Sequence, residues 1–142
     1  MHLCSPKTES EFEDYFELRW RILRKPWNQP QGSEQDADED ISYHLMAIDN
    51  DQVIGVARLQ FTNNNSAQLR YMAMDNNYQK LGIGRSIVEH MEAYAIQHEA
   101  NELFLNARDN ALIFYKKLGY EITEKSYLLF NSIQHYKMRK KL

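Results

Sequence analysis

Two stretches of this 142-residue chain combine residue types and spacing that suit chemistry. In the first, QKLGIG at residues 79–84, two of the chain's five glycines stand directly before a helical pattern. Glycine lets a ligand come closer to the main chain than a Cβ would allow, and a helix start attracts phosphate through its free N–H groups and dipole. This stretch therefore predicts a pyrophosphate site, with Lys80 and Arg85 adding charge beside the turn. The second stretch is NALIFYKKLGY at residues 110–120.

Three kinds of phosphate-binding turn have signatures that can be compared with the first stretch. A Walker A loop requires G-x-x-x-x-G-K-[ST], which the chain does not contain. A dinucleotide fingerprint requires G-x-G-x-x-G, but Ile87 stands where a small residue belongs. The pattern Q-x-x-G-x-G at a strand–helix junction fits at Gln79, Gly82 and Gly84. A glycine-rich turn that holds no ligand is the remaining alternative.

The composition is that of a globular protein, with 43% apolar and 26% charged residues. No apolar run approaches the roughly 20 residues that span a bilayer, and the N-terminus lacks the pattern of an export signal. A single cysteine, Cys4, cannot form an internal disulfide, so we expect a cytoplasmic protein. The net charge of −3 argues against a dedicated nucleic-acid binder. We therefore expect one domain over residues 1–142, with neither nucleic acid nor a membrane as its partner.

Hydrophobic periodicity and turn signals predict the order of the structural elements. A capping box at Thr8 and Glu11 opens a helix over residues 9–24, which Pro26 ends. A polar loop with five carboxylates follows at residues 25–41. Further strands are expected at 43–48, 53–61, 67–74, 102–106, 120–130 and 135–139, and further helices at 83–98 and 110–119. With a first strand before residue 9, the order is β-α-βββ-α-β-α-ββ, which predicts one mixed α/β sheet rather than a doubly wound fold.

Taken together, the two stretches resemble the GNAT superfamily of acyl-CoA-dependent N-acyltransferases. In that family a strand leads into the motif Q/R-x-x-G-x-G/A, which is followed by a helix and another strand. A second motif then contains an asparagine, an aromatic pair and, after three intervening residues, a glycine followed by Phe or Tyr. The matching residues are Gln79, Gly82, Gly84, Asn110, Phe114, Tyr115, Gly119 and Tyr120. The resemblance covers nearly the whole chain. It implies the GNAT acyltransferase fold, a mostly antiparallel sheet that splays and is flanked by helices.

The resemblance also implies roles for individual residues. Acetyl-CoA would lie where the sheet splays, with its pantetheine arm along the main chain of Met72 and Met74. The thioester carbonyl would face a main-chain N–H near Met72 and Ala73, and Tyr115 would donate a proton to the leaving thiolate. Without the resemblance, Tyr115 would be assigned to the core and Asn110 to a helix N-cap. The expected coenzyme-binding residues are Met72, Ala73, Met74, Gln79, Lys80, Leu81, Gly82, Ile83, Gly84, Arg85 and Asn110.

The acceptor site is less clearly marked in the sequence. The candidates are Trp27, Glu34, His44 and His135, each of which also has a purely structural interpretation. Small bacterial members of the family carry an E-x-D loop and an I-x-H near the C-terminus, which resemble residues 34–36 and 133–135. The acidic loop slightly favours a positively charged acceptor. The histidines lack ligand spacing, so no metal is expected.

We therefore expect an acetyl-CoA-dependent N-acetyltransferase in which a primary amine, of a small molecule or of a protein, attacks directly within a ternary complex. One alternative is a non-catalytic acyl-CoA-binding regulatory module on the same fold. Another is a nucleotide-binding protein with an unrelated fold. An apolar outer face on the helix at 83–98 would favour a homodimer.

Overall fold

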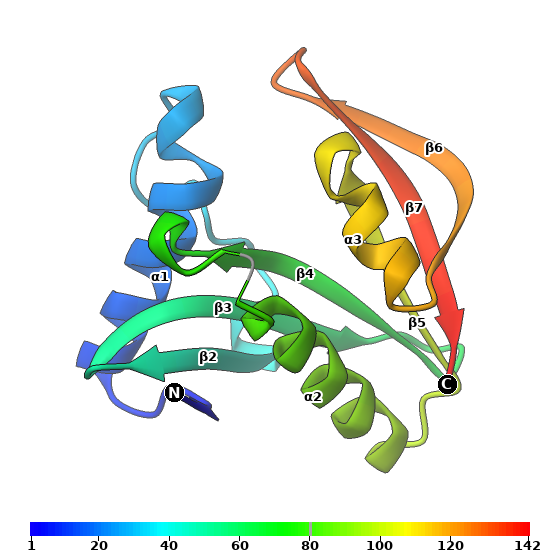
Figure 1. Ribbon diagram of the computed structural model, residues 1–142, viewed down its shortest axis with the longest axis horizontal. Coiled ribbons are helices and arrows are strands. Elements are labelled where there is room, and N and C mark those ends of the chain that lie inside the picture. Colours follow the sequence, from blue (N-terminus) through cyan, green and yellow to red (C-terminus); the bar gives the residue numbers. More distant parts are fainter. Residues whose placement is uncertain (80) are drawn as a thin grey trace.

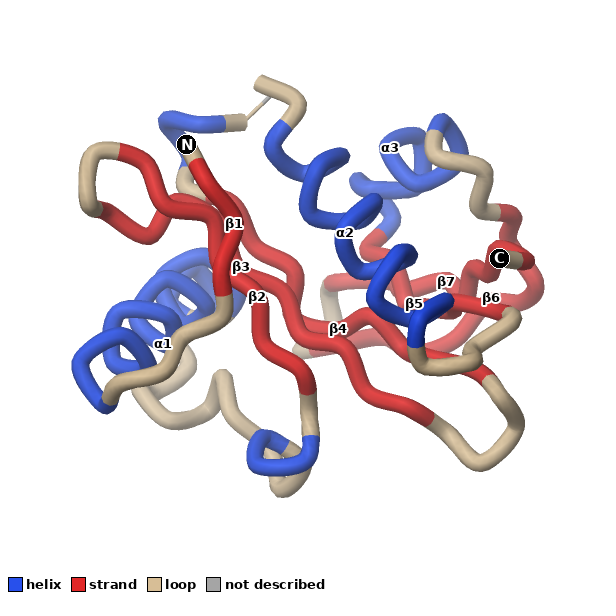
Figure 2. Tube along the Cα trace, turned by 90° about the horizontal axis from the view of Figure 1, so that it is seen from below, coloured by secondary structure: helices blue, strands red, loops and turns tan. Residues whose placement is uncertain are grey.

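The computed structural model describes residues 1–79 and 81–142 and shows a seven-stranded sheet with helices on both faces (Figure 1). Helix α1 lies against one face, and α2 and α3 lie against the other (Figure 2). The strands are β1 (His2–Cys4), β2 (Tyr43–Asp49), β3 (Gln52–Phe61), β4 (Ser66–Met74), β5 (Glu102–Arg108), β6 (Glu121–Leu129) and β7 (Ile133–Lys141). The helices are α1 (Glu9–Leu23), α2 (Ile83–Gln97) and α3 (Leu112–Lys117). This order confirms the one predicted from the sequence.

The sheet is divided where β4 meets β5. The strand order is β1-β2-β3-β4-β5-β7-β6, and every described neighbouring pair is antiparallel except β4 with β5. The parallel pairing runs only from Ser66 opposite Glu102 to Leu69 opposite Leu105. Both strands continue beyond these residues, to Met74 and Arg108, so they diverge and the sheet opens as a V (Figure 1). The predicted splayed, mostly antiparallel sheet is therefore confirmed.

A β-bulge in β4 lies just beyond the last paired residue. The register with β3 passes from Arg70 opposite Arg58 to Ala73 opposite Val56, so β4 holds one extra residue there. Tyr71 has a φ of 52°, a left-handed conformation that is uncommon for an aromatic residue. The bulge shifts the alternation of side chains by one position. Tyr71 consequently packs with the cluster beneath α1, whereas Met72 packs with the core beneath α2.

Each face of the sheet has its own apolar core. The larger core lies between the sheet and the α2–α3 layer, and its fully buried members include Ile87, Met91 and Leu103. The smaller one lies under α1 around Tyr15 and Leu18. Burial of these side chains stabilises the packing of the helices on both faces of the sheet, by roughly 25 cal/mol for each Å² of apolar surface.

Local signals in the sequence account for most helix ends. Thr8 Oγ1 accepts from the Glu11 amide at 3.1 Å, and the Glu11 carboxylate accepts from the Thr8 amide at 3.3 Å, which confirms the capping box. Gly119 follows α3 with a φ of 98°, as expected of a residue that ends a helix. The helix α3 is shorter than predicted, because residues 109–111 form a separate turn of 3-10 helix.

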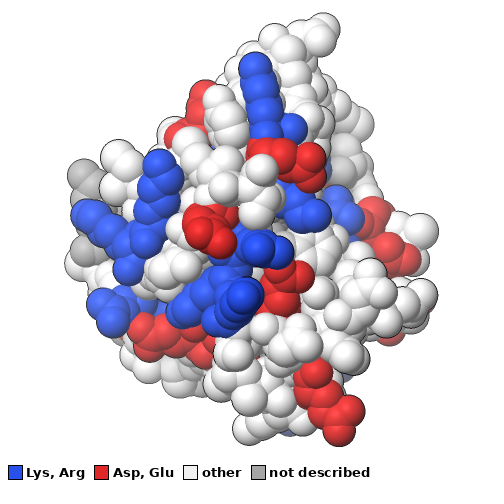
Figure 3. All heavy atoms as spheres, turned by 90° about the vertical axis from the view of Figure 1, so that its right-hand side faces the viewer, with Lys and Arg blue, Asp and Glu red and all other residues white. Residues whose placement is uncertain are grey.

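The outer surface over β6 and β7 carries both signs of charge, with basic and acidic side chains interspersed (Figure 3). Arg139 lies 3.4 Å from Glu102, and Lys140 lies 3.0 Å from Glu92. In the described part of the chain, no helix combines the length and the apolar character needed to cross a membrane.

Candidate active site

The opening between β4 and β5 contains a cavity of about 340 Å³. Its walls come from both halves of the sheet, from the end of α1 and from α3, so it exists only because the two strands diverge. The described lining residues with polar or sulfur-bearing side chains are Arg24, Gln68, Arg70, Tyr71, Met72, Asn106, Arg108, Tyr115, Tyr127 and His135.

Tyr115 projects from α3 to the inner end of this cavity. Its side chain is buried, and its hydroxyl donates to Met72 Sδ at 3.5 Å, across the gap between the two halves of the sheet. A thioether is a weak acceptor, so this hydroxyl is held without a strong partner. Burial raises the pKa of Tyr115, which keeps the phenol protonated at neutral pH.

The free edge of β4 presents main-chain groups to the cavity. The Asp75 amide donates to the Ile54 carbonyl of β3 at 2.8 Å. Because successive residues of a strand direct their N–H groups to opposite sides, the main chain of Met74 and Met72 faces away from β3. Ala73 stands opposite Val56 and bonds toward β3. The structure thus places Met72 and Met74 on the free edge and Ala73 on the paired edge.

The glycine turn lies at the start of α2. Gly82 is the N-cap residue with a φ of 79°, and among the described residues no side chain caps the helix. The first helical bond at this end runs from the Ser86 amide to the Gly82 carbonyl, so the amides of residues 83–85 precede it. A Cβ on Gly84 would lie 3.2 Å from both Met72 Cε and Phe114 Cζ, so the turn packs directly against the cavity wall.

His135 lies in the cavity wall on β7, opposite Arg108 of β5. Its ring is buried, stacks on Tyr127 with centroids 4.4 Å apart, and has Nδ1 3.0 Å from the Ile133 carbonyl. Because a carbonyl oxygen can only accept, Nδ1 carries the proton and Nε2 keeps its lone pair. Burial, and the nearby charge of Arg108 after it, lower the pKa of His135, so the ring is neutral at neutral pH.

Comparison with known proteins decides the family. A family model described as an acetyltransferase (GNAT) domain matches residues 19–142. The chain belongs to the GNAT acetyltransferase family. An N-acetyltransferase of Bacillus subtilis called YjcF, itself described as uncharacterized, is 28% identical to this GNAT chain over 134 residues, which is 94% of the chain and 95% of YjcF.

Solved GNAT structures have the same fold at low sequence identity. A putative N-acetyltransferase from Lactobacillus plantarum matches 99% of this chain and 97% of its own with a TM-score of 0.87 and 18% identity. An aminoglycoside 6′-N-acetyltransferase complexed with coenzyme A matches the same shares, 99% and 97%, with a TM-score of 0.83 and 15% identity. These likenesses confirm the predicted fold and exclude the unrelated nucleotide-binding fold.

The other predicted coenzyme residues of this GNAT domain lie around the turn and α3. Gln79 is exposed and donates to Asn76 Oδ1 at 3.2 Å, and Leu81 is 65% exposed. Arg85 is exposed and pairs with Glu89, whereas Ile83 is buried in the core. Lys80 lies outside the described residues. Asn110 is exposed, but it is not the helix N-cap, because Ala111 holds that position.

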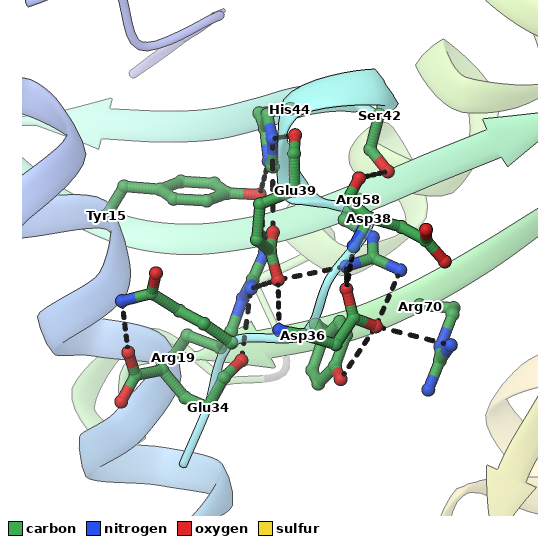
Figure 4. Close-up of polar contacts among 12 residues, drawn as sticks. Tyr15, Arg19, Glu34, Asp36, Asp38, Glu39, Ser42, His44, Arg58 and Arg70 are labelled. Carbon is green, nitrogen blue, oxygen red and sulfur yellow. Dashed lines mark hydrogen bonds and ion pairs between the residues drawn. The ribbon is translucent and has the colours of Figure 1, made fainter. Parts of the chain in front are cut away.

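Two of the predicted acceptor residues lie outside the cavity, in a polar network under α1 (Figure 4). His44 uses both ring nitrogens there, with Nδ1 2.8 Å from the Tyr15 hydroxyl and Nε2 2.8 Å from the Glu39 carbonyl. Glu34 is buried, and its carboxylate accepts from the Gly32 amide at 2.8 Å. Both residues therefore fix the loop at 33–42 in place.

Sequence reasoning missed the arginines at the centre of this network. Arg19 and Arg58 are fully buried, and both donate to Glu39 Oε2 at 2.9 Å. Arg58 also forms a fork with Asp36, at 2.6 and 3.0 Å. The strand VIGVARLQF did contain a signal, because Arg58 is the one charged residue in an apolar run and a buried charge needs a partner of opposite charge.

Asp36 joins the network to the β4 bulge. Besides Arg58, it accepts from the Tyr71 hydroxyl at 3.2 Å and lies 3.4 Å from Arg70 (Figure 4). Burial alone would raise the pKa of Asp36, but the hydrogen bonds from Arg58 and from the Asp38 amide outweigh it and lower the pKa to about 2. Asp36 and Glu39 therefore bind arginines, and Asp36 also holds the bulge; neither lines the cavity.

Trp27 is not among the described residues that line the cavity; it follows α1 and contacts the turn between β6 and β7. Its ring is tilted against Phe130 with centroids 6.4 Å apart. This contact joins the two halves of the molecule across the open side of the V. Among the described residues, no group of three or more His, Cys, Asp or Glu side chains is arranged to hold a metal ion.

Proposed function

We propose that this protein is an N-acetyltransferase that passes the acetyl group of acetyl-CoA directly to a primary amine. The observation that carries the proposal is the free β4 edge, with a protonated tyrosine at one end of it and an uncapped helix start packed against it. A solved protein of the same fold is complexed with coenzyme A, which supports this choice of donor.

The residues present fit the coenzyme. Gly82 provides the left-handed conformation that exposes the amides of residues 83–85, and a helix start of this kind suits a pyrophosphate. A Cβ on Gly84 would narrow the passage from this turn to the cavity. The outward main chain of Met72 and Met74 can bond an extended arm as an added strand would. Acetyl-CoA supplies an acetyl group activated as a thioester.

The β4 edge also has a role in the reaction. As the amine attacks, negative charge develops on the carbonyl oxygen. A fixed main-chain N–H at the free edge near Met72 stabilises that charge, because it needs no reorientation as the charge develops. The bulge at Tyr71 keeps this N–H in place, and Asp36 keeps the bulge in place through the Tyr71 hydroxyl.

Tyr115 stabilises the leaving sulfur. A hydroxyl that already donates to a weak sulfur acceptor at 3.5 Å can turn to a thiolate, which is a stronger acceptor. Its raised pKa makes complete proton transfer to the thiolate unfavourable, because the conjugate thiol has a pKa of only about 8.5. Tyr115 therefore acts first as a hydrogen-bond donor, and the proton released by the amine finally neutralises the sulfur.

His135 accepts the proton that the amine nitrogen releases as it attacks. A free alkylammonium has a pKa of about 10.4, so it first loses one proton to solvent. Attack of the neutral amine makes its nitrogen acidic, and the free Nε2 lone pair of the neutral, buried ring in the same cavity accepts this second proton, directly or through one water molecule, before it passes to the sulfur.

The proposal is tested by release of free thiol from acetyl-CoA in the presence of a panel of primary amines. The variant Tyr115→Phe should lose about tenfold to a thousandfold in turnover, with affinity for coenzyme A unchanged by calorimetry. The matched control is Tyr120→Phe, which removes a nearby buried hydroxyl that donates to Glu92 outside the cavity. Thiol release with no amine dependence, or equal turnover in both variants, would refute the proposal and favour a protein that only binds the coenzyme.

A further inference from the structure

Two arginines from distant parts of the chain converge on the α1 side of the cavity. Arg24 Nη1 donates to the Leu23 carbonyl at 3.1 Å, and Arg108 Nη2 donates to the same oxygen at 3.3 Å. The two nitrogens can be no farther apart than the sum of these distances. Both side chains are half-buried and both line the cavity.

The charge of this pair is not compensated within the described part of the chain. Neither Arg24 nor Arg108 forms an ion pair there, and no described lining residue of the cavity is Asp or Glu. Burial, and after it the neighbouring charge of Arg24, lower the pKa of Arg108. All the other arginines have a carboxylate partner: Arg19, Arg21, Arg58, Arg70, Arg85 and Arg139.

Capping the end of α1 does not account for two guanidinium groups. A helix C-terminus carries about half a negative charge, which one cation satisfies. Each guanidinium has five N–H donors. Within the described structure Arg108 uses one of them, and Arg24 uses two, to the Leu23 and Ser33 carbonyls. Several donors are therefore left for a ligand in the cavity, with the forked geometry that suits an oxyanion.

The pair does not belong to the coenzyme's phosphates. The start of α2 lies on the opposite face of the sheet from α1 (Figure 2). Arg24 and Arg108 meet at Leu23, the last residue of α1. An anion bound by this pair therefore lies at the α1 end of the cavity, away from the start of α2.

We propose that Arg24 and Arg108 form a subsite for an acidic group of the acceptor, so that the substrate is an amine that also carries a carboxylate or a phosphate. This inference rests on the proposed acetyl transfer. The loop carboxylates Asp36 and Glu39 already bind arginines, so they do not attract a polycationic acceptor.

Three acceptors of matched length test the subsite: β-alanine, O-phosphoethanolamine and ethylamine. The first two differ from ethylamine by a carboxylate and a phosphate, and together they show which oxyanion is preferred. We expect kcat/KM for at least one of them to exceed that for ethylamine by about tenfold or more. In Arg108→Gln and Arg24→Gln the ratio of kcat/KM for the acidic acceptor to kcat/KM for ethylamine should fall to about one, with KM for acetyl-CoA unchanged. The control Arg139→Gln removes an ion-paired arginine on the outer surface of β7.

A binding measurement separates this inference from the proposed function. Calorimetry should show N-acetyl-β-alanine or N-acetyl-phosphoethanolamine binding at least tenfold more tightly than N-ethylacetamide, and Arg108→Gln should abolish the difference. Equal binding of the three acetylated compounds, or a loss of kcat/KM in Arg108→Gln that is the same for all three acceptors, overturns the subsite. Failure of coenzyme A itself to bind overturns the proposed function instead, and the acetylated compounds still decide the subsite.

Discussion

Replacing Asp36 by asparagine removes a charge on which two structural features depend, the buried Arg58 and the Tyr71 bulge. The pKa of Asp36 is lowered from 3.8 to about 2, and each unit corresponds to about 1.36 kcal/mol. The full shift would be about 2.4 kcal/mol, but the side chain is 26% exposed and partly screened by solvent. We therefore expect Asp36→Asn to lower the free energy of unfolding at pH 7 by about 1–2 kcal/mol.

The same shift fixes how this difference depends on pH. A carboxylate with a lowered pKa stabilises the folded state above its unfolded pKa, and the stabilisation is lost as the pH falls through its folded pKa. The difference in the free energy of unfolding between wild type and Asp36→Asn should be constant above about pH 5 and about half as large at pH 3. Urea unfolding across this range measures it.

Asp40→Asn is the matched control, because Asp40 is an exposed carboxylate four residues away. It should leave the unfolding free energy within about 0.5 kcal/mol. If Asp36→Asn were as mild as this control, or if its effect did not change between pH 7 and pH 3, the network would not hold the loop as described.

Two further predictions concern the cavity. Gly84→Ala places a Cβ 3.2 Å from Met72 Cε and Phe114 Cζ. This crowding should lower the free energy of unfolding by about 1 kcal/mol in urea and weaken coenzyme A binding by about tenfold in calorimetry. Unchanged affinity for coenzyme A would contradict the proposal that the coenzyme passes Gly84 on its way from the turn to the cavity. Because the pKa of His135 is lowered from 6.5, kcat/KM for the acceptor should fall on acidification with an added step below pH 6.5, and this step should be absent in His135→Gln. The same pH profile in wild type and His135→Gln would exclude His135 as the proton acceptor.

Local signals were sufficient for much of the fold. The capping box at Thr8 and the alternation in β2 to β4 are patterns whose physical cause lies within a few residues. The Q-x-x-G-x-G turn likewise predicts a helix start, because the left-handed φ of Gly82 is costly for other residues.

The remaining features depend on contacts between distant segments. No residue type marks the left-handed Tyr71, which is held by partners more than 30 residues away in the sequence, such as Asp36. Periodicity assigns charged residues to the surface, so it cannot show that Arg58 is fully buried. Arg24 and Arg108 come together only because the end of α1 reaches the end of β5.

The central claim is that the free β4 edge and the start of α2 bind one ligand. Amide hydrogen exchange with and without coenzyme A tests it directly. Binding should slow exchange at residues 83–85 and at Met72 and Met74 together, and leave β2, which does not line the cavity, unchanged. Binding that protects neither the helix start nor the β4 edge would contradict the account.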